Sequence, residues 1–190
     1  MDRRTLVLGI STAAAVGAHA QDEKKKPLVV LETSMGEIHI ELNPQKAPVS
    51  VKNFLDYVAA KHYDGTVFHR VVPDFVIQGG GFTAELMQKP NRDPIKNEAG
   101  NGLLNTRGTL AMARTSVVDS ATAQFFINLK DNDFLNHRDD TAQGFGYCVF
   151  GRVVKGMDVV DRIAAVKTGD QGPHRNVPLT PVTVKTARLK

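Results

Sequence analysis

Short segments in which apolar and polar residues alternate dominate the chain from residue 28 onward. In the clearest of them, residues 37–42, Ile38, Ile40 and Leu42 alternate with polar neighbours. A period of two is typical of a strand with one buried face. An apolar run at 28–32 and a turn at 34–36 come before it, so we predict a β-hairpin with these three side chains inward. Six further short apolar segments, each bounded by Gly, Pro, Asn or Asp, are predicted as strands: 67–72, 75–78, 109–113, 125–129, 148–153 and 182–189.

Two segments have helical spacing instead. Apolar residues three and four positions apart follow Pro48, a residue that suits the first turn of a helix, and predict an amphipathic helix over residues 48–61. The same spacing predicts a second helix on the stripe formed by Val153, Met157, Val160 and Ala164. A parallel βαβ sheet would need a helix between successive strands. We therefore predict a mainly β fold, a closed antiparallel barrel whose ends are covered by the two helices.

Residues 1–20 have the pattern of an export signal. Two arginines precede a short apolar stretch, and the segment ends in Ala18-His19-Ala20, which is typical of a small-residue cleavage site. The stretch is too short to span a bilayer, and no later stretch is apolar for long enough to serve as a stable membrane anchor. We predict a cleaved signal peptide at 1–20, a disordered charged leader at 21–27 and one domain at 28–190. The adjacent arginines also fit a twin-arginine signal, but the short basic region favours the general secretory route.

Composition and missing motifs exclude several functions. The chain has 24 Lys and Arg against 20 Asp and Glu, and these charges are scattered, so we predict no binding to nucleic acid. The single cysteine, Cys148, excludes an internal disulfide and is predicted to be a small buried residue. The sequence lacks a serine-hydrolase elbow, a phosphate-binding loop, a dinucleotide fingerprint and a metal-binding histidine pair. We therefore predict no cofactor and no metal ion.

Arg70 stands out because it lies within a segment otherwise suited to burial. Such a charge is costly in a strand unless it is paired or faces a cleft. One interpretation is a structural arginine held by Asp74 or Glu98. The other is a functional arginine at the edge of an apolar pocket. Sequence spacing alone does not decide between them.

The residues around Arg70 closely resemble the signature of a known family. The segment Phe68-His69-Arg70-Val71-Val72-Pro73-Asp74-Phe75-Val76-Ile77-Gln78-Gly79-Gly80 is similar to that of the cyclophilin-type peptidyl-prolyl cis-trans isomerases. Further similar blocks follow in the family order at 108–114, 120–127 and 145–151, so the resemblance covers nearly the whole chain after the leader. The export signal, a shortened central loop and Asn97-Glu98-Ala99 resemble the bacterial periplasmic branch. The resemblance implies a periplasmic enzyme with a closed eight-stranded antiparallel β-barrel capped by two α-helices. It would act on proline-containing unfolded or partly folded polypeptides without a cofactor.

The resemblance also implies a groove on the outer face of the barrel. Arg70 would be the catalytic residue, donating a hydrogen bond to the nitrogen of a twisted prolyl amide. The substrate-binding residues would be His69, Phe75, Val76, Gln78, Met112, Ala113, Arg114, Gln124, Phe126, Phe134, Leu135 and Tyr147. Of these, the pocket for the proline ring would be formed by Phe75, Met112, Phe126 and Leu135, with Phe134 beside it.

Two departures from the family pattern bear on ligands. Phe134 stands where well-known eukaryotic members have Trp, so we expect at most weak binding of cyclosporin. Arg114 stands where those members have Asn, and this longer cation is expected to alter substrate preference. Two other roles stay open: a peptide-binding module or holdase that does not depend on turnover, and a structural role in a larger assembly. The sequence suggests no large apolar patch, so we expect a monomer.

Overall fold

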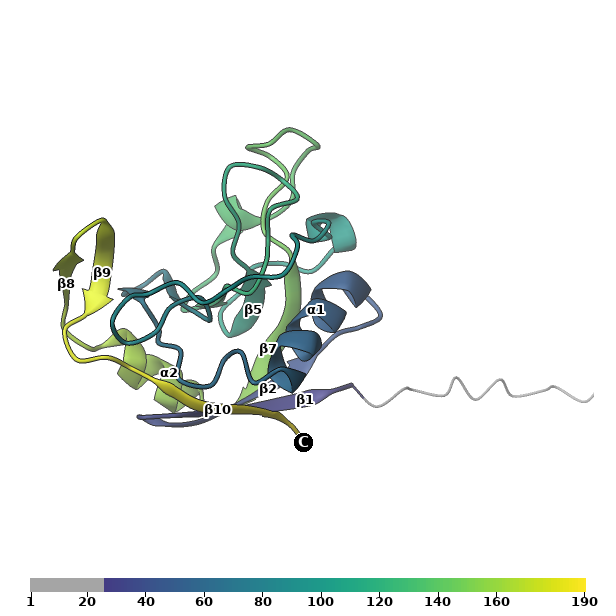
Figure 1. The fold of residues 1–190 in the computed structure, drawn as a ribbon. Coiled ribbons are helices and arrows are strands. Elements are labelled where there is room, and N and C mark those ends of the chain that lie inside the picture. The colour runs from purple at the N-terminus through teal and green to yellow at the C-terminus, as the bar shows by residue number, and fades with distance from the viewer. Residues whose placement is uncertain (1–25) are drawn as a thin grey trace, which may run out of the picture.

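Ten strands and two α-helices follow one another along residues 26–190, the part of the chain that the computed structural model describes (Figure 1). The strands are β1 (Leu28–Thr33), β2 (Gly36–Leu42), β3 (Arg70–Val72), β4 (Val76–Gly79), β5 (Thr109–Met112), β6 (Phe125–Asn128), β7 (Val149–Lys155), β8 (Thr168–Gln171), β9 (His174–Pro178) and β10 (Val184–Leu189). The helices are α1 (Pro48–Ala59) and α2 (Met157–Ala164), with two short 3-10 helices, η1 (Ala99–Asn101) and η2 (Asp133–Leu135). No helix among these residues is long and apolar enough to cross a membrane.

The N-terminal boundary of the domain differs slightly from the prediction. The predicted signal peptide at 1–20 and residues 21–25 of the predicted leader lie outside the described residues. Lys26 and Pro27, the last two residues of that leader, contact β2. The Lys26 ammonium lies 3.5 Å from the Glu41 carboxylate, and the Pro27 carbonyl accepts a hydrogen bond of 2.8 Å from the Leu42 N–H. Both residues therefore belong to the folded domain.

Eight strands form one antiparallel sheet in the order β10-β1-β2-β7-β5-β6-β4-β3. They coincide with the eight predicted segments, so the mainly β fold with two helices is confirmed. Several boundaries differ by one to three residues: residues 67–69 precede β3, α1 ends at Ala59, and β10 begins only at Val184. In addition, Val153 lies in β7 rather than in the second helix. Gly156, with a φ of 93°, separates that strand from α2. A left-handed φ costs glycine no Cβ clash, so the chain turns sharply there and the helical stripe begins only at Met157.

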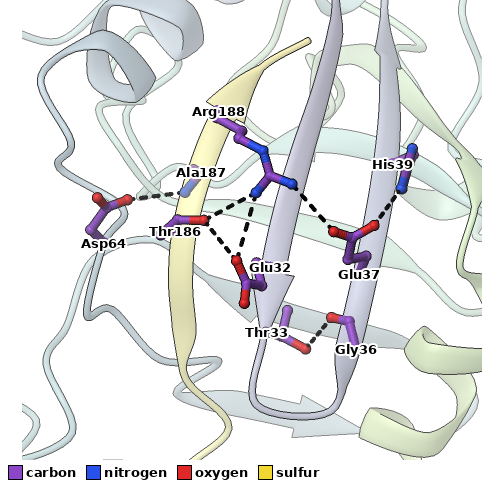
Figure 2. Close-up of polar contacts among 9 residues, drawn as sticks. All are labelled: Glu32, Thr33, Gly36, Glu37, His39, Asp64, Thr186, Ala187 and Arg188. Atoms are coloured by element: carbon purple, nitrogen blue, oxygen red, sulfur yellow. Dashed lines mark hydrogen bonds and ion pairs between the residues drawn. The ribbon is translucent and has the colours of Figure 1, made fainter.

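The two edge strands of this sheet, β3 and β10, are joined by a few bonds rather than by a continuous ladder. Val67 and Thr183 form an isolated β-bridge, and the Phe68 N–H donates to the Val182 carbonyl at 2.9 Å. Nearby, the Asp64 carboxylate accepts a hydrogen bond of 3.0 Å from the N–H of Ala187 in β10 (Figure 2). The prediction of a fully closed barrel is therefore overstated, because closure is partial and local.

The concave side of the sheet holds the main core, and both helices complete it. The α1 residue Phe54 is fully buried, with its ring centroid 5.0 Å from that of Tyr63 and 5.3 Å from that of Phe150. The residues that α2 adds to the same cluster are Val159, Val160 and Ile163. Burying one such large apolar side chain stabilises a fold by roughly 1.5–3 kcal/mol. Because the interior is filled in this way, a substrate site has to lie on the outer face.

Candidate active site

One row of outward-facing side chains crosses four neighbouring strands. The register pairs Arg70 of β3 with Gln78 of β4, Gln78 with Phe126 of β6, and Phe126 with Ala111 of β5. Directly paired residues lie on the same face of a sheet, so these four side chains share one face. The register therefore places a guanidinium, an amide and an aromatic ring side by side, with the small Ala111 at the end of the row.

A hollow of about 190 Å³ opens over this row. It is lined by Arg70, Phe75, Val76, Gln78, Ala113, Arg114, Phe126, Leu135 and Tyr147, all of them predicted site residues. The hollow is smaller than the roughly 300–1,000 Å³ of typical small-molecule pockets, so it suits one side chain of a longer ligand. Part of its wall is apolar, because Val76, Phe126 and Leu135 belong to a second buried cluster that is separate from the main core. The rest is polar, with Arg70, Gln78 and Arg114 among the lining residues.

Met112 does not belong to this hollow, and its predicted role is corrected. It is paired with Phe125 in the register and is 2% exposed within the main core. Side chains alternate along a strand, so Met112 points inward while Ala111 and Ala113 point outward. The pocket wall that the resemblance attributed to Met112 is provided by Val76 and Ala113. The sequence alone allows this correction, because consecutive residues of a strand face opposite sides, so Met112 and Ala113 cannot both face the groove.

His69 is also placed away from the groove. Its side chain is buried, and its ring centroid lies 4.7 Å from that of Phe82. Burial, together with the nearby charges of His174 and Arg70, lowers the pKa of His69 to about 4. His69 therefore packs in the interior next to Arg70 and does not line the hollow.

Two other predicted residues lie at the margins of the hollow. Phe134 is 62% exposed, and its ring stacks on that of Phe75 at 5.6 Å between centroids. Gln124 accepts a hydrogen bond of 3.0 Å from the side-chain amide of Gln78. Phe134 thus extends the apolar rim, and Gln124 fixes the orientation of Gln78.

The surroundings of Arg70 exclude the purely structural interpretation. Within residues 26–190 its guanidinium has no carboxylate partner. Glu98, one proposed partner, accepts hydrogen bonds from Val49 and Ser50 at the start of α1, and Asp74 is exposed in a turn. Arg70 instead lies 5.6 Å from the centre of the Phe75 ring and donates a long hydrogen bond of 3.4 Å to the Gln78 side-chain oxygen. Its charge therefore faces the hollow.

Arg114 forms the wall between this hollow and a second one of about 260 Å³. Its Nε, Nη1 and Nη2 donate to the carbonyls of Gly146, Thr115 and Ala142 at 2.9, 3.0 and 2.9 Å. The guanidinium also lies 4.9 Å from the centre of the Tyr147 ring. These contacts hold Arg114 in place and join two loops to the site.

The second hollow contains residues that the sequence did not indicate. Besides Gln78, Ala113, Arg114 and Gln124, it is lined by Gln88, Asn91, Thr115, Ser120 and Thr122. These side chains come from the long polar stretch after β4 and from the loop between β5 and β6. No pattern in the sequence brings these two segments together, since their contact depends on the fold.

Other candidate sites lack comparable chemistry. A larger hollow of about 730 Å³ lies between α1 and β10, but it carries no row of converging polar and aromatic groups like that around Arg70. Residues 26–190 contain no group of three or more His, Cys, Asp or Glu side chains that could hold a metal ion. Cys148 is 2% exposed, as predicted, and burial raises the pKa of its thiol to about 11. The groove around Arg70 therefore remains the candidate active site.

Comparison with known proteins agrees with this geometry. The family model described as "Cyclophilin type peptidyl-prolyl cis-trans isomerase/CLD" matches residues 28–188. A peptidyl-prolyl cis-trans isomerase of Acinetobacter baylyi is 53% identical over 190 residues, which cover 100% of this chain and 96% of the relative. Peptidyl-prolyl cis-trans isomerase B of Escherichia coli is 56% identical over 162 residues, which cover 85% of this chain and 99% of the relative.

The fold has solved counterparts as well. A cyclophilin type peptidyl-prolyl cis-trans isomerase of Cryptosporidium parvum, crystallised in the presence of the dipeptide Ala-Pro, matches with a TM-score of 0.70 at 24% identity, over 86% of this chain and 98% of that chain. At this identity the similarity concerns the fold alone. The family match and the two bacterial relatives span most of the sequence. The chain therefore belongs to the cyclophilin-type peptidyl-prolyl cis-trans isomerases and is an enzyme of that kind.

Proposed function

We propose that the groove around Arg70 is the active site and that Arg70 speeds rotation about an X–Pro bond by donating a hydrogen bond to the prolyl nitrogen. A peptide C–N bond resists rotation because of its partial double-bond character, with a barrier of about 18–20 kcal/mol. Unassisted X–Pro isomerisation is correspondingly slow. Twisting the bond returns a lone pair to the nitrogen, so the nitrogen accepts a hydrogen bond only in the twisted state.

The observation that carries this proposal is the guanidinium of Arg70, which has no carboxylate partner among residues 26–190 and faces a hollow with an apolar part formed by Phe75, Phe126 and Leu135. Arginine stays protonated at all relevant pH values and donates N–H groups in a fixed plane. A bond made only to the twisted amide lowers the barrier without stabilising either planar ground state. The walls of Phe126 and Leu135 would hold the proline ring, and Gln78 would orient Arg70 through its side-chain oxygen.

We further propose that the enzyme acts as a monomer outside the cytoplasmic membrane, on exported polypeptides that are still folding. The signal-like pattern of residues 1–20 supports export by the general secretory route. The exposed large apolar residues are dispersed over several loops and strands rather than gathered into one face, which supports the monomer. Fractionation should recover the mature protein in the periplasm with Gln21 at its N-terminus, and sedimentation should give the mass of one chain. A full-length chain in the cytoplasm would contradict the export proposal.

The test of the catalytic proposal is the isomerisation rate of the Arg70→Ala variant on a proline-containing peptide. Loss of one preorganised donor should lower kcat/KM by about 10²–10³-fold. Arg70→Lys keeps the positive charge but loses the planar guanidinium, so its kcat/KM should lie between those of Arg70→Ala and the wild type. Arg152→Ala is a matched control, because Arg152 pairs with Glu41 on the surface and does not line the groove. Unchanged turnover in a folded Arg70→Ala protein would refute the role of Arg70.

A further inference from the structure

The second hollow, beside the proline pocket, has a lining of unusual charge. Among the described residues that line it, all side chains except that of Ala113 are polar, and Arg114 alone is charged. The uncharged polar side chains are Gln78, Gln88, Asn91, Thr115, Ser120, Thr122 and Gln124. Three of them already donate within the protein: Thr115 to Ser120, Ser120 to the Val117 carbonyl, and Gln78 to Gln124. The side chains of Gln88, Asn91, Thr122 and Gln124 donate to no other described residue, so they can donate to a ligand. A space lined by several donors and one cation, without an acidic group, suits a carboxylate.

No carboxylate among residues 26–190 neutralises the charge of Arg114. Its three hydrogen bonds go to carbonyl oxygens, and it takes part in none of the ion pairs of these residues. Two acidic residues on the loops that it joins are occupied elsewhere. Asp119 accepts a hydrogen bond from the Asn97 N–H, and Asp139 accepts one from the Thr141 N–H. A guanidinium has five N–H donors, so two remain for a ligand.

The two hollows are joined in a way that one peptide can use. Gln78, Ala113 and Arg114 line both of them, so the hollows are immediate neighbours. A peptide with its proline ring in the first hollow would therefore place a residue close in sequence near the second. Arg114 is half-buried, and such a charge is screened by salt less than one on the open surface.

We propose that Arg114 makes the second hollow a carboxylate subsite, so that the enzyme prefers polypeptides with Asp or Glu close to the proline. This inference rests on the proposed function, because it assumes that the first hollow receives the proline. A carboxylate on a guanidinium forms charge-assisted hydrogen bonds, which are shorter and stronger than neutral ones. The competing explanation is that Arg114 only fastens the loops at 115 and 142–146 through its carbonyl contacts.

The experiment compares peptides that differ only by Glu or Gln at each of the two positions before and the two positions after the proline. For the wild type at low salt, we expect kcat/KM to favour Glu by about three- to tenfold at one or more positions. The preference should shrink in about 0.5 M salt. Arg114→Gln should lower the Glu/Gln ratio toward one, and Arg114→Lys should keep part of it. Any attraction of Arg70 for acidic peptides remains in the ratio of every protein, so the fall from the wild-type ratio to that of Arg114→Gln measures the share due to Arg114.

Arg138→Gln is the matched control. Arg138 is exposed on the loop that Arg114 fastens, it lines neither hollow, and its replacement changes the net charge equally. Its Glu/Gln ratio should equal that of the wild type. A merely structural role for Arg114 predicts that its variants slow both peptides alike, with an unchanged ratio, and that result would overturn the inference. So would a wild-type ratio of one at all four positions.

Failure of the proposed function gives a different result. In that case no peptide would be isomerised faster than in buffer. The subsite is then judged by NMR titration with the same Glu and Gln peptides. A ratio of dissociation constants that favours Glu and disappears in Arg114→Gln supports the inference, and equal constants overturn it.

Discussion

At the scale of single residues, the arginines of the groove differ from the other arginines in how their charge is used. Most arginines among the described residues form ion pairs: Arg92 with Asp56, Arg107 with Asp161, Arg152 with Glu41, Arg162 with Asp158, Arg175 with Asp170 and Arg188 with Glu37. Arg70 and Arg114 line the groove and have no carboxylate partner between residues 26 and 190. A partly buried charge without a partner is costly to the folded protein. A substrate that supplies the missing hydrogen-bond acceptor removes this cost, so both guanidinium groups are suited to bind one.

His69 gives a prediction about pH. Its pKa is about 4 in the folded protein and near 6.5 when unfolded, because burial disfavours the charged ring. Above pH 6.5 neither state binds the proton. Between pH 6.5 and 4 only the unfolded state does, so the free energy of unfolding should fall as the pH falls. The loss should approach about 3 kcal/mol and become constant below pH 4.

The matched measurement is urea unfolding of the wild type and of His69→Gln across this pH range. The variant cannot take up this proton in either state, so its stability should depend less steeply on pH between 6.5 and 4. Its stability at neutral pH is expected to be lower, because a buried ring is lost, but only the slope tests the prediction. Identical slopes would show that His69 does not hold a depressed pKa.

The site was predictable residue by residue only where the sequence resembles a known signature. That resemblance placed nine of the residues that line the hollow. It was wrong for Met112, because likeness to a motif does not say which face of a strand a residue occupies. Alternation along β5 does say this, and it places Ala113 outward. The lining of the second hollow, such as Asn91 and Thr115, has no local signal because it arises from contacts between distant loops.

At the scale of elements, the start of α1 depends on a side chain that is distant in sequence. Ala47 occupies the N-cap and has no side-chain acceptor for the first N–H groups. The Glu98 carboxylate accepts from the N–H groups of Val49 and Ser50 at 3.0 and 2.9 Å, and from the Ser50 hydroxyl at 2.8 Å. The negative charge also complements the positive end of the helix. Glu98 thus fastens the long polar stretch after β4 to the helix that fills the core.

We expect Glu98→Ala to lower the free energy of unfolding by about 1–2 kcal/mol, as loss of a helix cap does. Glu98→Gln keeps an oxygen acceptor but loses the charge, so its stability should lie between those of the alanine variant and the wild type. Urea titration at neutral pH measures all three proteins. If the alanine variant matched the wild type, α1 would not depend on this cap.

The elements themselves were largely predictable, and the exception has a physical reason. The eight strands of the main sheet each carry an apolar run or alternation, which marks a buried face. The β8–β9 hairpin was missed because its segments, Thr168–Gln171 and His174–Pro178, are mostly polar and partly exposed. Such a hairpin is held by its ladder hydrogen bonds and leaves no hydrophobic period in the sequence.

At the scale of the whole molecule, the register between strands was beyond the reach of sequence patterns. The ladders between β1 and β10, between β2 and β7, and between β5 and β7 each contain an irregularity that shifts the pairing. The row from Arg70 to Ala111 depends on pairs of residues separated by up to 48 positions in the chain. Local alternation gives the face of each residue, but only the assembled sheet decides which residues of that face are neighbours.

Near its C-terminal strand the sheet is joined locally to the segment before β3, where Asp64 accepts a hydrogen bond from the Ala187 N–H (Figure 2). The same view shows Arg188 of β10 between Glu32 of β1 and Glu37 of β2. The ion pairs of Arg188 with these two carboxylates measure 3.7 and 3.3 Å. These ion pairs are exposed, and exposed pairs contribute little to stability. The hydrogen bond to Asp64 is different. The Asp64 carboxylate is the acceptor for the Ala187 N–H, which belongs to an edge strand.

Asp64→Ala should therefore lower the free energy of unfolding by about 1–2 kcal/mol, since it leaves a half-buried N–H without an acceptor. Asp64→Asn keeps an oxygen there and should lose less. Asp93→Ala is the control, because Asp93 is exposed and forms no hydrogen bond or ion pair within the described residues. Hydrogen exchange locates the effect: the Ala187 amide should exchange faster in Asp64→Ala while the amides of β6 stay protected. Unchanged protection of Ala187 would mean that the backbone bonds of residues 65–68 with Val182 and Val184 hold β10 in place without Asp64.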